Sequence, residues 1–492
     1  MTEAAKNPVS TGIAEYDGNP LVSCLPAPLS MADTYAMLRR MPDCSEHERR
    51  LPAHLRQQLV VLRLRKAFIP TTQQVLFAQQ LGMLVRAGYD GAEIGDVRGV
   101  RRMAEFADQV EAGATIQTVV PRFAPTAYCG SLIGPSGMGK TTTASAALNA
   151  LPQVVRHVSP LTFEQLVYLR IECPTSGSPK QACIAFFDAV DRCLGTKYSK
   201  RYSGVAADQQ MLGVAYVAQL HRLGLLVVDE IQFLRDAKVG EAEVLNFLTT
   251  LVNVINVPVM LVGTTAAIEL LTSTFRNARR SEGVGSAVFD RMKNDREWKR
   301  FVTELLRLQW TTEVTPYSDD LADALWEASQ GIVDIVMKIF MIAQIRLMRA
   351  SERRRTREVI TPALVAKVLK EDLQLVRGML RALRNPRSKQ LARLDDLRPL
   401  DQAFENILGA HYASGVSLPE VDSAAASALK VPEDQLDETL VRTLTSLGFA
   451  ADVAGLMVSN ARLTVPSGDP LQTLSALMSA AGGQDVRQAE CV

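Results

Sequence analysis

The feature that most constrains this chain is the string GPSGMGKT, residues 134–141, which fits the pattern GxxxxGK[ST] in full. An apolar run, residues 128–133, precedes the string, and a helical pattern begins within it. Glycines in such a loop allow backbone N–H groups to converge on phosphate oxygens at the positive end of the following helix. The sequence therefore predicts a phosphate-binding loop between a buried strand and a helix.

The residues of this loop have separate expected roles. Lys140 is expected to reach the β- and γ-phosphates of a nucleotide, and the Thr141 hydroxyl is expected to ligate Mg²⁺. We therefore predict ATP and Mg²⁺ as cofactors. The predicted nucleotide-binding residues are Gly134, Pro135, Ser136, Gly137, Met138, Gly139, Lys140, Thr141 and Thr142.

A second element, an acidic pair after a buried strand, follows downstream. The string LLVVDE ends in Asp229 and Glu230, and Asp229 lies 89 residues after Lys140. We expect Asp229 to hold Mg²⁺, directly or through water, and Glu230 to polarise the attacking water. Such a base distinguishes a hydrolase from a passive nucleotide binder.

Two further catalytic roles have candidates. Thr264 follows the apolar run VPVMLVG and is placed to sense the γ-phosphate, although an ordinary hydroxyl at a strand end is the alternative interpretation. A positive charge near the γ-phosphate can come from a neighbouring subunit, and such an arginine is worth about 10³–10⁵ in rate where it operates. The candidates for it are Arg276, Arg279, Arg280 and Arg291, of which we take Arg279 and Arg280 as the catalytic pair.

The pattern of apolar residues divides the chain into five regions. Residues 1–30, rich in Pro, Gly and Ser, predict a flexible arm, and residues 31–115 predict a helical N-terminal region. In residues 116–310, short apolar strands alternate with helices, which predicts an α/β core with a parallel sheet covered on both faces. Residues 311–395 predict a helical lid, in which Lys338 is a possible nucleotide contact, and residues 396–492 predict a mostly helical, acidic extension.

Composition excludes several classes of protein. The 492 residues are 47% hydrophobic and 22% charged, which is typical of a globular chain. No apolar run approaches the roughly 18–20 residues that span a bilayer, and the N-terminus lacks the pattern of a signal peptide, so we expect a soluble, cytoplasmic protein. The seven cysteines include no CxxC pair, which favours reduced intracellular thiols over a disulfide framework or a zinc site.

Charge is distributed unevenly along the chain. Residues 399–492 contain 12 acidic and 4 basic residues, a net charge of −8, so residues 1–398 carry about +9 to give the total of +1. This asymmetry is consistent with a body that approaches a polyanion and a tail that prefers another partner. A solvated acidic tail without a partner explains the charge equally well.

Taken together, the phosphate loop, the acidic pair, the polar sensor, the arginine cluster and the lid resemble the AAA+ ATPases. Several strings are similar to TnsC, the AAA+ regulator of heteromeric cut-and-paste transposons, and more distantly to TniB. The resemblance covers residues 50–350. The strings are FIPTTQQVLFAQQLGMLVRAGY, LVYLRIECPTSGSPKQACIAFF, LLVVDEIQFL, LNFLTTLVNVINVPVMLVGT, FRNARR, RMKNDREWKRF, LQWT and SQGIVDIVMKIFMIAQ.

This resemblance implies a function on DNA. TnsC-like proteins bind ATP, assemble as rings or filaments around duplex DNA, and connect a target selector of the TniQ or TnsD type to the transposase. Their extended C-terminal part contacts transposase and endonuclease subunits of the TnsB and TnsA types. The resemblance therefore implies a bacterial protein that is associated with the nucleoid when it is on DNA.

The residues themselves support DNA binding less directly. In a ring, the helix after the second strand would face the channel, which nominates Lys180, and the string TKYSKRYSG adds Lys197, Lys200 and Arg201. Spaced basic residues with tyrosines suit phosphate contacts without sequence preference, and an ordinary solvated loop is the alternative. A denser arginine run suits either DNA or the acidic tail; it consists of Arg346, Arg349, Arg353, Arg354, Arg355 and Arg357.

The leading hypothesis is an ATP-switched assembly that licenses transposition and uses hydrolysis for disassembly. Two alternatives remain open at this stage. An AAA+ helicase loader or initiator would use the same nucleotide motifs for mechanical work. A signalling ATPase that never contacts nucleic acid is also compatible with the near-zero net charge.

Overall fold

The computed structural model divides the chain into two compact units, residues 1–407 and 408–492. All residues described below belong to the first unit and none lies beyond residue 384, so the predicted acidic extension, residues 396–492, lies outside them. In the part of the chain that is described, every helix is too short or too polar to cross a bilayer. The described residues are 3–4, 10–90, 97–113, 129–158, 161–174, 178–234, 257–267, 287–354 and 356–384.

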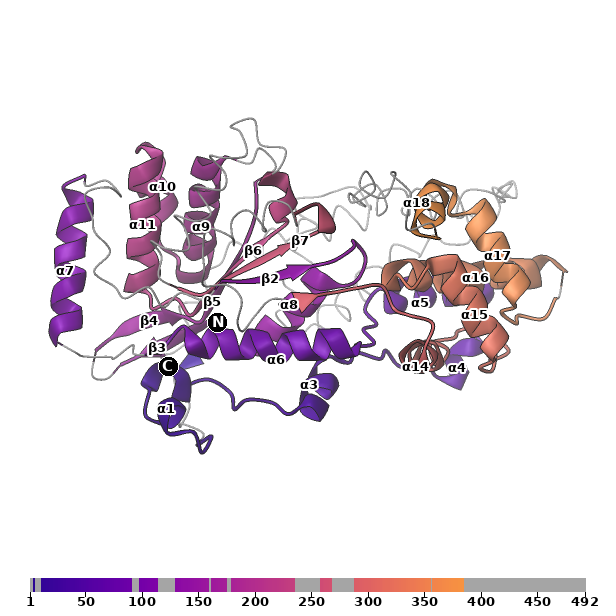
Figure 1. Cartoon of the computed structure of the whole chain (residues 1–492). Helices are drawn as coiled ribbons and strands as arrows, with labels where there is room; N and C mark the ends of the chain where they lie inside the picture. The colour runs from indigo at the N-terminus through magenta and orange to yellow at the C-terminus, as the bar shows by residue number, and fades with distance from the viewer. Residues whose placement is uncertain are drawn as a thin grey trace, which may run out of the picture. The chain divides into compact units, whose positions relative to one another are not determined.

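A five-stranded parallel sheet forms the centre of the fold (Figure 1), in the order β5-β6-β7-β2-β8. Every residue of β2, β6 and β7 is buried, because these largely apolar strands have neighbours on both faces. The predicted α/β class with a parallel sheet is thereby confirmed. The strands are β2 (Cys129–Ile133), β5 (Tyr168–Glu172), β6 (Leu225–Asp229), β7 (Val259–Gly263) and β8 (Ala287–Val288).

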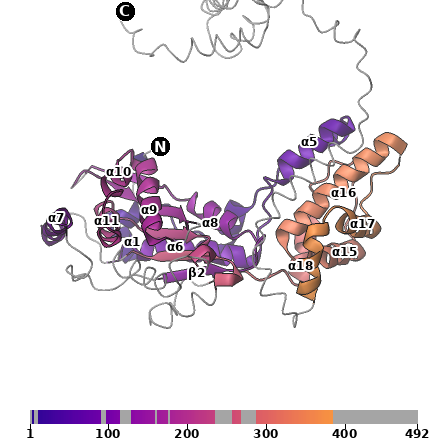
Figure 2. The same cartoon turned by 90° about the horizontal axis from the view of Figure 1, so that it is seen from above.

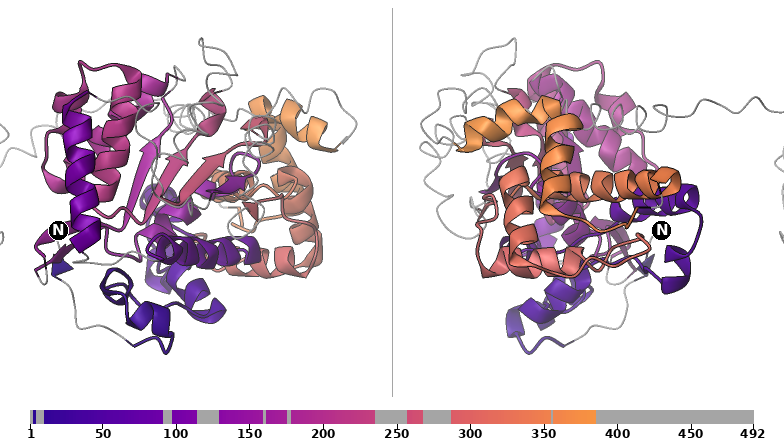
Figure 3. Two further views of the ribbon diagram at one scale, coloured as in Figure 1. Left: turned by 60° about the vertical axis from the view of Figure 1, so that its left-hand side comes forward. Right: turned by 90° about the vertical axis from the view of Figure 1, so that its right-hand side faces the viewer.

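Helices cover both faces of this sheet (Figure 3). One face packs against helices α9 and α11 through a core that includes Phe186, Phe187 and Val214. Tyr202 of helix α10 stacks on Phe187, with ring centroids 4.5 Å apart, and so seals the edge of this core. Among the described residues, the helices of the sheet domain are α8 (Lys140–Leu148), α9 (Pro179–Leu194), α10 (Tyr198–Tyr202) and α11 (Ala207–Leu220).

The segment before the sheet is helical, as predicted. Helix α6 packs against α8 and begins at a capping box, in which the Thr71 and Gln74 side chains bond to each other's backbone N–H groups. Two short helices, α1 and α2, lie within the segment that the sequence predicts to be a flexible arm. The described helices before the sheet are α1 (Ala14–Asp17), α2 (Pro20–Ser23), α3 (Met31–Leu38), α4 (Glu46–Arg49), α5 (Ala53–Leu64), α6 (Thr72–Ala87) and α7 (Val97–Glu111).

A second, smaller sheet was not predicted from the sequence. Strand β3 (Val154–His157) pairs antiparallel with β4 (Phe163–Leu166) and parallel with β1 (Glu3–Ala4). The ring of His157 stacks on Phe163 at 4.7 Å, and His157 bonds to the buried Gln165 side chain. These strands are only two to four residues long, which leaves little periodic signal in the sequence.

The segment after the sheet is a helical lid, again as predicted. Its helices begin at side-chain caps, which are Asp295 for α14, Ser318 for α15 and Thr361 for α17. Trp298 and Phe340 are fully buried in this bundle. The lid helices are α14 (Arg296–Leu305), α15 (Asp319–Ser329), α16 (Val333–Arg354), α17 (Pro362–Glu371) and α18 (Gln374–Arg384).

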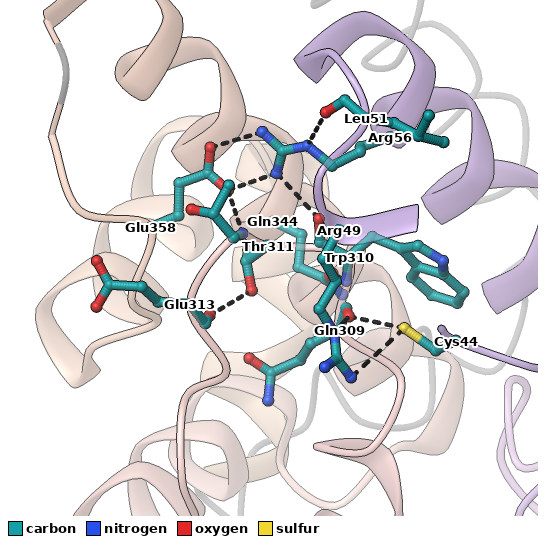
Figure 4. A network of polar contacts seen from close by, with 11 residues as sticks. Cys44, Arg49, Leu51, Arg56, Gln309, Trp310, Thr311, Glu313, Gln344 and Glu358 are labelled. Carbon is teal, nitrogen blue, oxygen red and sulfur yellow. Dashed lines mark hydrogen bonds and ion pairs between the residues drawn. The ribbon is translucent and has the colours of Figure 1, made fainter. Parts of the chain in front are cut away.

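Helix α5 of the N-terminal region lies along α16 of the lid (Figure 2). The two regions are joined by a buried ion pair between Arg56 and Glu358, with N–O distances of 2.5 and 2.9 Å (Figure 4). Arg56 also donates to the carbonyls of Leu51 and Trp310. Because Glu358 accepts a further bond from the Thr312 N–H, both charged groups are enclosed by partners. We call this group the helical junction.

Candidate nucleotide-binding site

The predicted phosphate-binding loop connects β2 to α8, and its conformation requires glycine, as two examples show. Gly139, at the start of α8, has φ of +79°, a region that side chains disfavour. Gly134 lies so close to the next segment that a Cβ atom would stand 2.2 Å from the Phe289 carbonyl oxygen. Both positions therefore exclude a side chain, which fixes the conformation of the loop before α8.

Lys140 is buried at the mouth of the loop. Its Nζ donates to the carbonyl oxygens of Gly134, at 2.8 Å, and Pro135, at 2.9 Å. Burial lowers the pKa of Lys140 to about 8, while the charges of Glu230 and Asp229 act in the opposite direction. A cation held only by neutral carbonyls in a partly desolvated site is well suited to receive an anion.

Asp229 meets the loop at the end of β6. Its carboxylate accepts a bond from the Thr141 hydroxyl at 3.0 Å, and the Glu230 backbone N–H donates to its other oxygen at 2.9 Å. The structure thus brings together the two predicted magnesium ligands, which are 88 residues apart in sequence. A hydroxyl and a carboxylate are oxygen donors of the kind that Mg²⁺ prefers.

Arg170 is a member of this group that the sequence analysis missed. It extends from β5 and donates to Asp229 at 2.9 Å and to the Ser145 hydroxyl of α8 at 2.7 Å. Strand β5 pairs with β6 in a register that sets Glu172 opposite Asp229. A basic residue two positions before the end of a strand carries no motif, so only the pairing register could have indicated it.

Glu230 and Thr264 face the same space from neighbouring strands. Glu230 has φ of +60°, which is unusual for a residue with a side chain and turns the chain sharply after β6. Thr264 follows the end of β7, and its buried Oγ1 has no hydrogen-bond partner among the described residues. An unpaired buried hydroxyl beside a loop that is shaped for phosphate fits a ligand oxygen.

The loop is also held by residues from outside the sheet. The Gln74 amide of α6 donates to the Met138 carbonyl at 3.0 Å, and the Asp334 N–H of α16 donates to the Gly137 carbonyl at 3.0 Å. Gln74 was missed from the sequence because it lies 64 residues before its partner. The N-terminal helices and the lid therefore both contact the phosphate-binding loop directly.

These elements enclose a cavity of about 440 Å³. Its lining includes polar groups of the loop, Asp229, Glu230 and Thr264, together with the apolar side chains of Phe68, Ile69 and Met341. Lys338 of the lid also lines the cavity, and its Nζ bonds to Asp334 at 2.7 Å. A cavity lined by both polar and apolar side chains suits a ligand that has a charged group and an apolar ring.

The predicted arginine pair does not enter this description. Arg276, Arg279 and Arg280 lie outside the described residues, so their role stays a prediction. Arg291 donates to the Gln330 carbonyl at 3.3 Å.

The predicted DNA contacts lie away from the cavity wall. Lys180 is exposed in the first turn of α9, and Lys197, Lys200 and Arg201 are exposed at α10. Arg201 pairs with Glu111 of α7 at 3.1 Å. All four residues are accessible, and their contact with DNA stays a prediction.

The denser arginine run is partly paired within its own unit. Arg346 bonds to Glu371 at 2.7 Å and to Asp372 at 2.9 Å. Arg357 pairs with Glu313 at 2.5 Å. These two arginines therefore already have acidic partners among the lid residues, while Arg355 lies outside the described residues.

The strand order, the loop between β2 and α8, the acidic pair on β6 and the helical lid define the AAA+ P-loop fold. Residues 124–271 match the family model described as AAA domain. No curated protein matches the chain.

Several solved structures are similar to the chain at low sequence identity. The Aeropyrum pernix ORC2 protein in ADPNP and ADP complexes is 15% identical, covering 66% of this chain and 90% of its own, with a TM-score of 0.33. A Walker-type ATPase of Pyrococcus abyssi is 14% identical over 62% and 88%, with a TM-score of 0.34. The Aeropyrum pernix ORC1 protein in complex with DNA is 15% identical over 79% and 94%, with a TM-score of 0.35.

Proposed function

We propose that this chain is a magnesium-dependent ATPase that assembles on duplex DNA and licenses transposition. The observation that carries the ATPase part is the cavity, where the phosphate-binding loop, Asp229, Glu230 and Thr264 face one space. The glycine cradle, the neutral partners of Lys140 and the unpaired Thr264 hydroxyl all suit a nucleotide phosphate.

Each polar residue of the cavity has one role in this proposal. Lys140 binds the terminal phosphates, and Thr141 and Asp229 hold Mg²⁺, which would supply charge neutralisation at the phosphates. Glu230 orients the attacking water and takes up its proton. Thr264 donates its hydroxyl to the γ-phosphate region, and Arg279 or Arg280 is supplied by a neighbouring copy of the chain.

The DNA and transposition parts of the proposal have different support. They depend on the resemblance to TnsC in residues 50–350 and on the accessible basic residues Lys180, Lys197, Lys200 and Arg201. In this proposal the protein forms a homo-oligomer on DNA in the bacterial cytoplasm. It then connects a target selector of the TniQ or TnsD type to transposase and endonuclease subunits of the TnsB and TnsA types.

The experiment that tests this function is a measurement of particle mass on a short DNA duplex at low salt. Four samples are compared, which contain ATP, a non-hydrolysable ATP analogue, ADP, or no nucleotide. We expect multi-subunit complexes with the two triphosphates only, because the γ-phosphate stabilises contact between subunits.

The other outcomes separate the alternatives. Nucleotide-dependent assembly without DNA would favour a signalling ATPase. Assembly on DNA together with ATP-driven strand separation would favour a loader or initiator. Monomers that do not assemble with either DNA or nucleotide would overturn the proposed function, although the fold would stand.

A further inference from the structure

The turn after β6 directs one buried amide back toward the cavity. Because Glu230 adopts a positive φ, the chain reverses at once and enters a short 3-10 turn, η1 (Ile231–Leu234). Ile231 is fully buried beneath this turn and anchors it. Gln232, which is 6% exposed, then lies beside the ends of both β6 and β7.

Both ends of the Gln232 amide are used, and each contacts a residue of the cavity wall. Its Nε2 donates to the Glu230 carboxylate, and its Oε1 accepts the Thr264 backbone N–H at 3.2 Å. This pairing fixes the orientation of the amide, because the reversed orientation would place an NH₂ group against an N–H and an oxygen against a carboxylate.

The end of β7 is shaped to permit this contact. A Cβ atom on Gly263 would stand 2.7 Å from the Ile231 side chain and 3.2 Å from the Gln232 oxygen. Only glycine at this position therefore allows β7 to approach the turn so closely. Among the described residues, the cavity wall includes Glu230, Gly263 and Thr264 but not Gln232, so Gln232 stands behind the wall.

We propose that Gln232 is a positioning residue that fixes the Glu230 carboxylate relative to Thr264. It makes the general base and the γ-phosphate sensor a single unit, because a shift of the Thr264 backbone must move the amide that holds Glu230. This inference rests on the proposed ATPase function. It assigns a role to a residue that the nucleotide motifs do not include.

The test replaces Gln232 with methionine, which has a similar volume but cannot make either hydrogen bond. We expect kcat for ATP hydrolysis to fall about 10- to 100-fold, as for a misplaced catalytic group. The KM for ATP and the affinity for a non-hydrolysable analogue should change less than about twofold, because Gln232 does not line the cavity. Gln232→Asn, whose side chain is one methylene shorter, should also lower kcat more than it changes the KM, but to a smaller extent. This variant replaces the methionine variant in the test if the latter fails to fold.

A matched control comes from another buried glutamine. Gln210 of α11 is fully buried, bonds to the Tyr202 carbonyl at 2.8 Å, and does not line the cavity. Gln210→Met should lower the melting temperature while leaving kcat within about twofold. An equal fall in kcat for both variants would mean that a general loss of packing explains the result, and would overturn the proposal.

A double-mutant cycle separates this inference from the proposed function. In a Glu230→Gln background, Gln232→Met should cause no further loss in kcat, because both changes act on the same step. A double variant whose loss in kcat equals the product of the two single losses would overturn the positioning role. Wild-type turnover by Glu230→Gln alone would reject Glu230 as the base, and with it the proposed mechanism. Loss of ATP hydrolysis in Glu230→Gln together with full activity in Gln232→Met would reject only the role of Gln232.

Discussion

The nucleotide cavity and the helical junction each contain a buried basic residue, and they satisfy it differently. Lys140 is held by two neutral carbonyls beside a cavity, whereas Arg56 makes hydrogen bonds to both oxygens of Glu358 and to two carbonyls. In the cavity, Thr264 Oγ1 lacks a partner among the described residues. Between these two regions, the polar groups of the cavity are thus incompletely paired, whereas those of the junction are saturated.

The substitution with the largest expected effect on the cavity removes its buried cation. Lys140→Ala should reduce both ATP-dependent assembly on DNA and phosphate release below detection, because no other loop side chain supplies a positive charge to the phosphates. Its melting temperature should stay close to that of the wild type, since burial already opposes the charge of Lys140 and only two hydrogen bonds to carbonyls are lost. The measurements are particle mass and phosphate release.

A suitable control for this variant is Lys299→Ala. Lys299 is an exposed lysine of α14 that pairs with Asp319 and does not line the cavity. Assembly of Lys140→Ala at the affinity of the control would contradict the assignment.

A second change in the cavity should separate binding from turnover. Glu230→Gln removes the proposed base but keeps the shape and the contacts of the loop. We expect turnover to fall about 10²- to 10⁴-fold, with assembly on DNA retained. Glu172→Gln is the matched control, because Glu172 ends the neighbouring strand opposite Asp229 without lining the cavity. Comparable losses in the two variants would remove Glu230 from its role.

In the helical junction, removal of the buried basic residue should lower the stability of the fold. Arg56→Met leaves Glu358 buried without its partner, so the free energy of unfolding should fall by about 3–5 kcal/mol. Urea unfolding measures this loss. The affinity of the folded protein for ATP should change much less, since Arg56 does not line the cavity.

The double variant Arg56→Met/Glu358→Leu sharpens this test. Replacing the whole pair with apolar side chains removes the unpaired charge, so more than half of the lost stability should return. A double variant as unstable as Arg56→Met would show that the other bonds of Arg56, to Leu51 and Trp310, dominate its contribution.

The smallest expected effect is a dependence of stability on pH. Burial acts to raise the pKa of Glu358, but hydrogen bonds from Arg56 and Thr312 hold the pKa below its ordinary value of 4.5. Ionised Glu358 therefore contributes stability that is complete above pH 4.5 and is lost as the pH falls through the lower pKa of the folded state. Urea unfolding between pH 7 and pH 3 should show a smaller acid-induced loss in Glu358→Gln than in the wild type.

The sequence predicted the cavity far better than the junction, and chain distance explains the difference. The phosphate-binding loop and the acidic pair consist of neighbouring residues whose spacing is itself the signal. Arg56 and Glu358 are 302 residues apart, and each resembles an ordinary surface charge until the helices are placed. Gln74, Arg170 and Gln232 were missed for the same reason, since their partners are set by helix packing and strand register.

The contact of α6 with the loop and of α5 with the lid makes the N-terminal region a second connection between the lid and the sheet. The seven residues between α5 and α6 join a helix anchored to the lid with a helix anchored to the loop, and several of them line the cavity. A chain of seven residues reaches at most about 25 Å, so this tether limits how far the lid can lie from the phosphate-binding loop. A fragment that begins at residue 116 would lose both this tether and one wall of the cavity, so the smallest complete nucleotide-binding unit begins before α5.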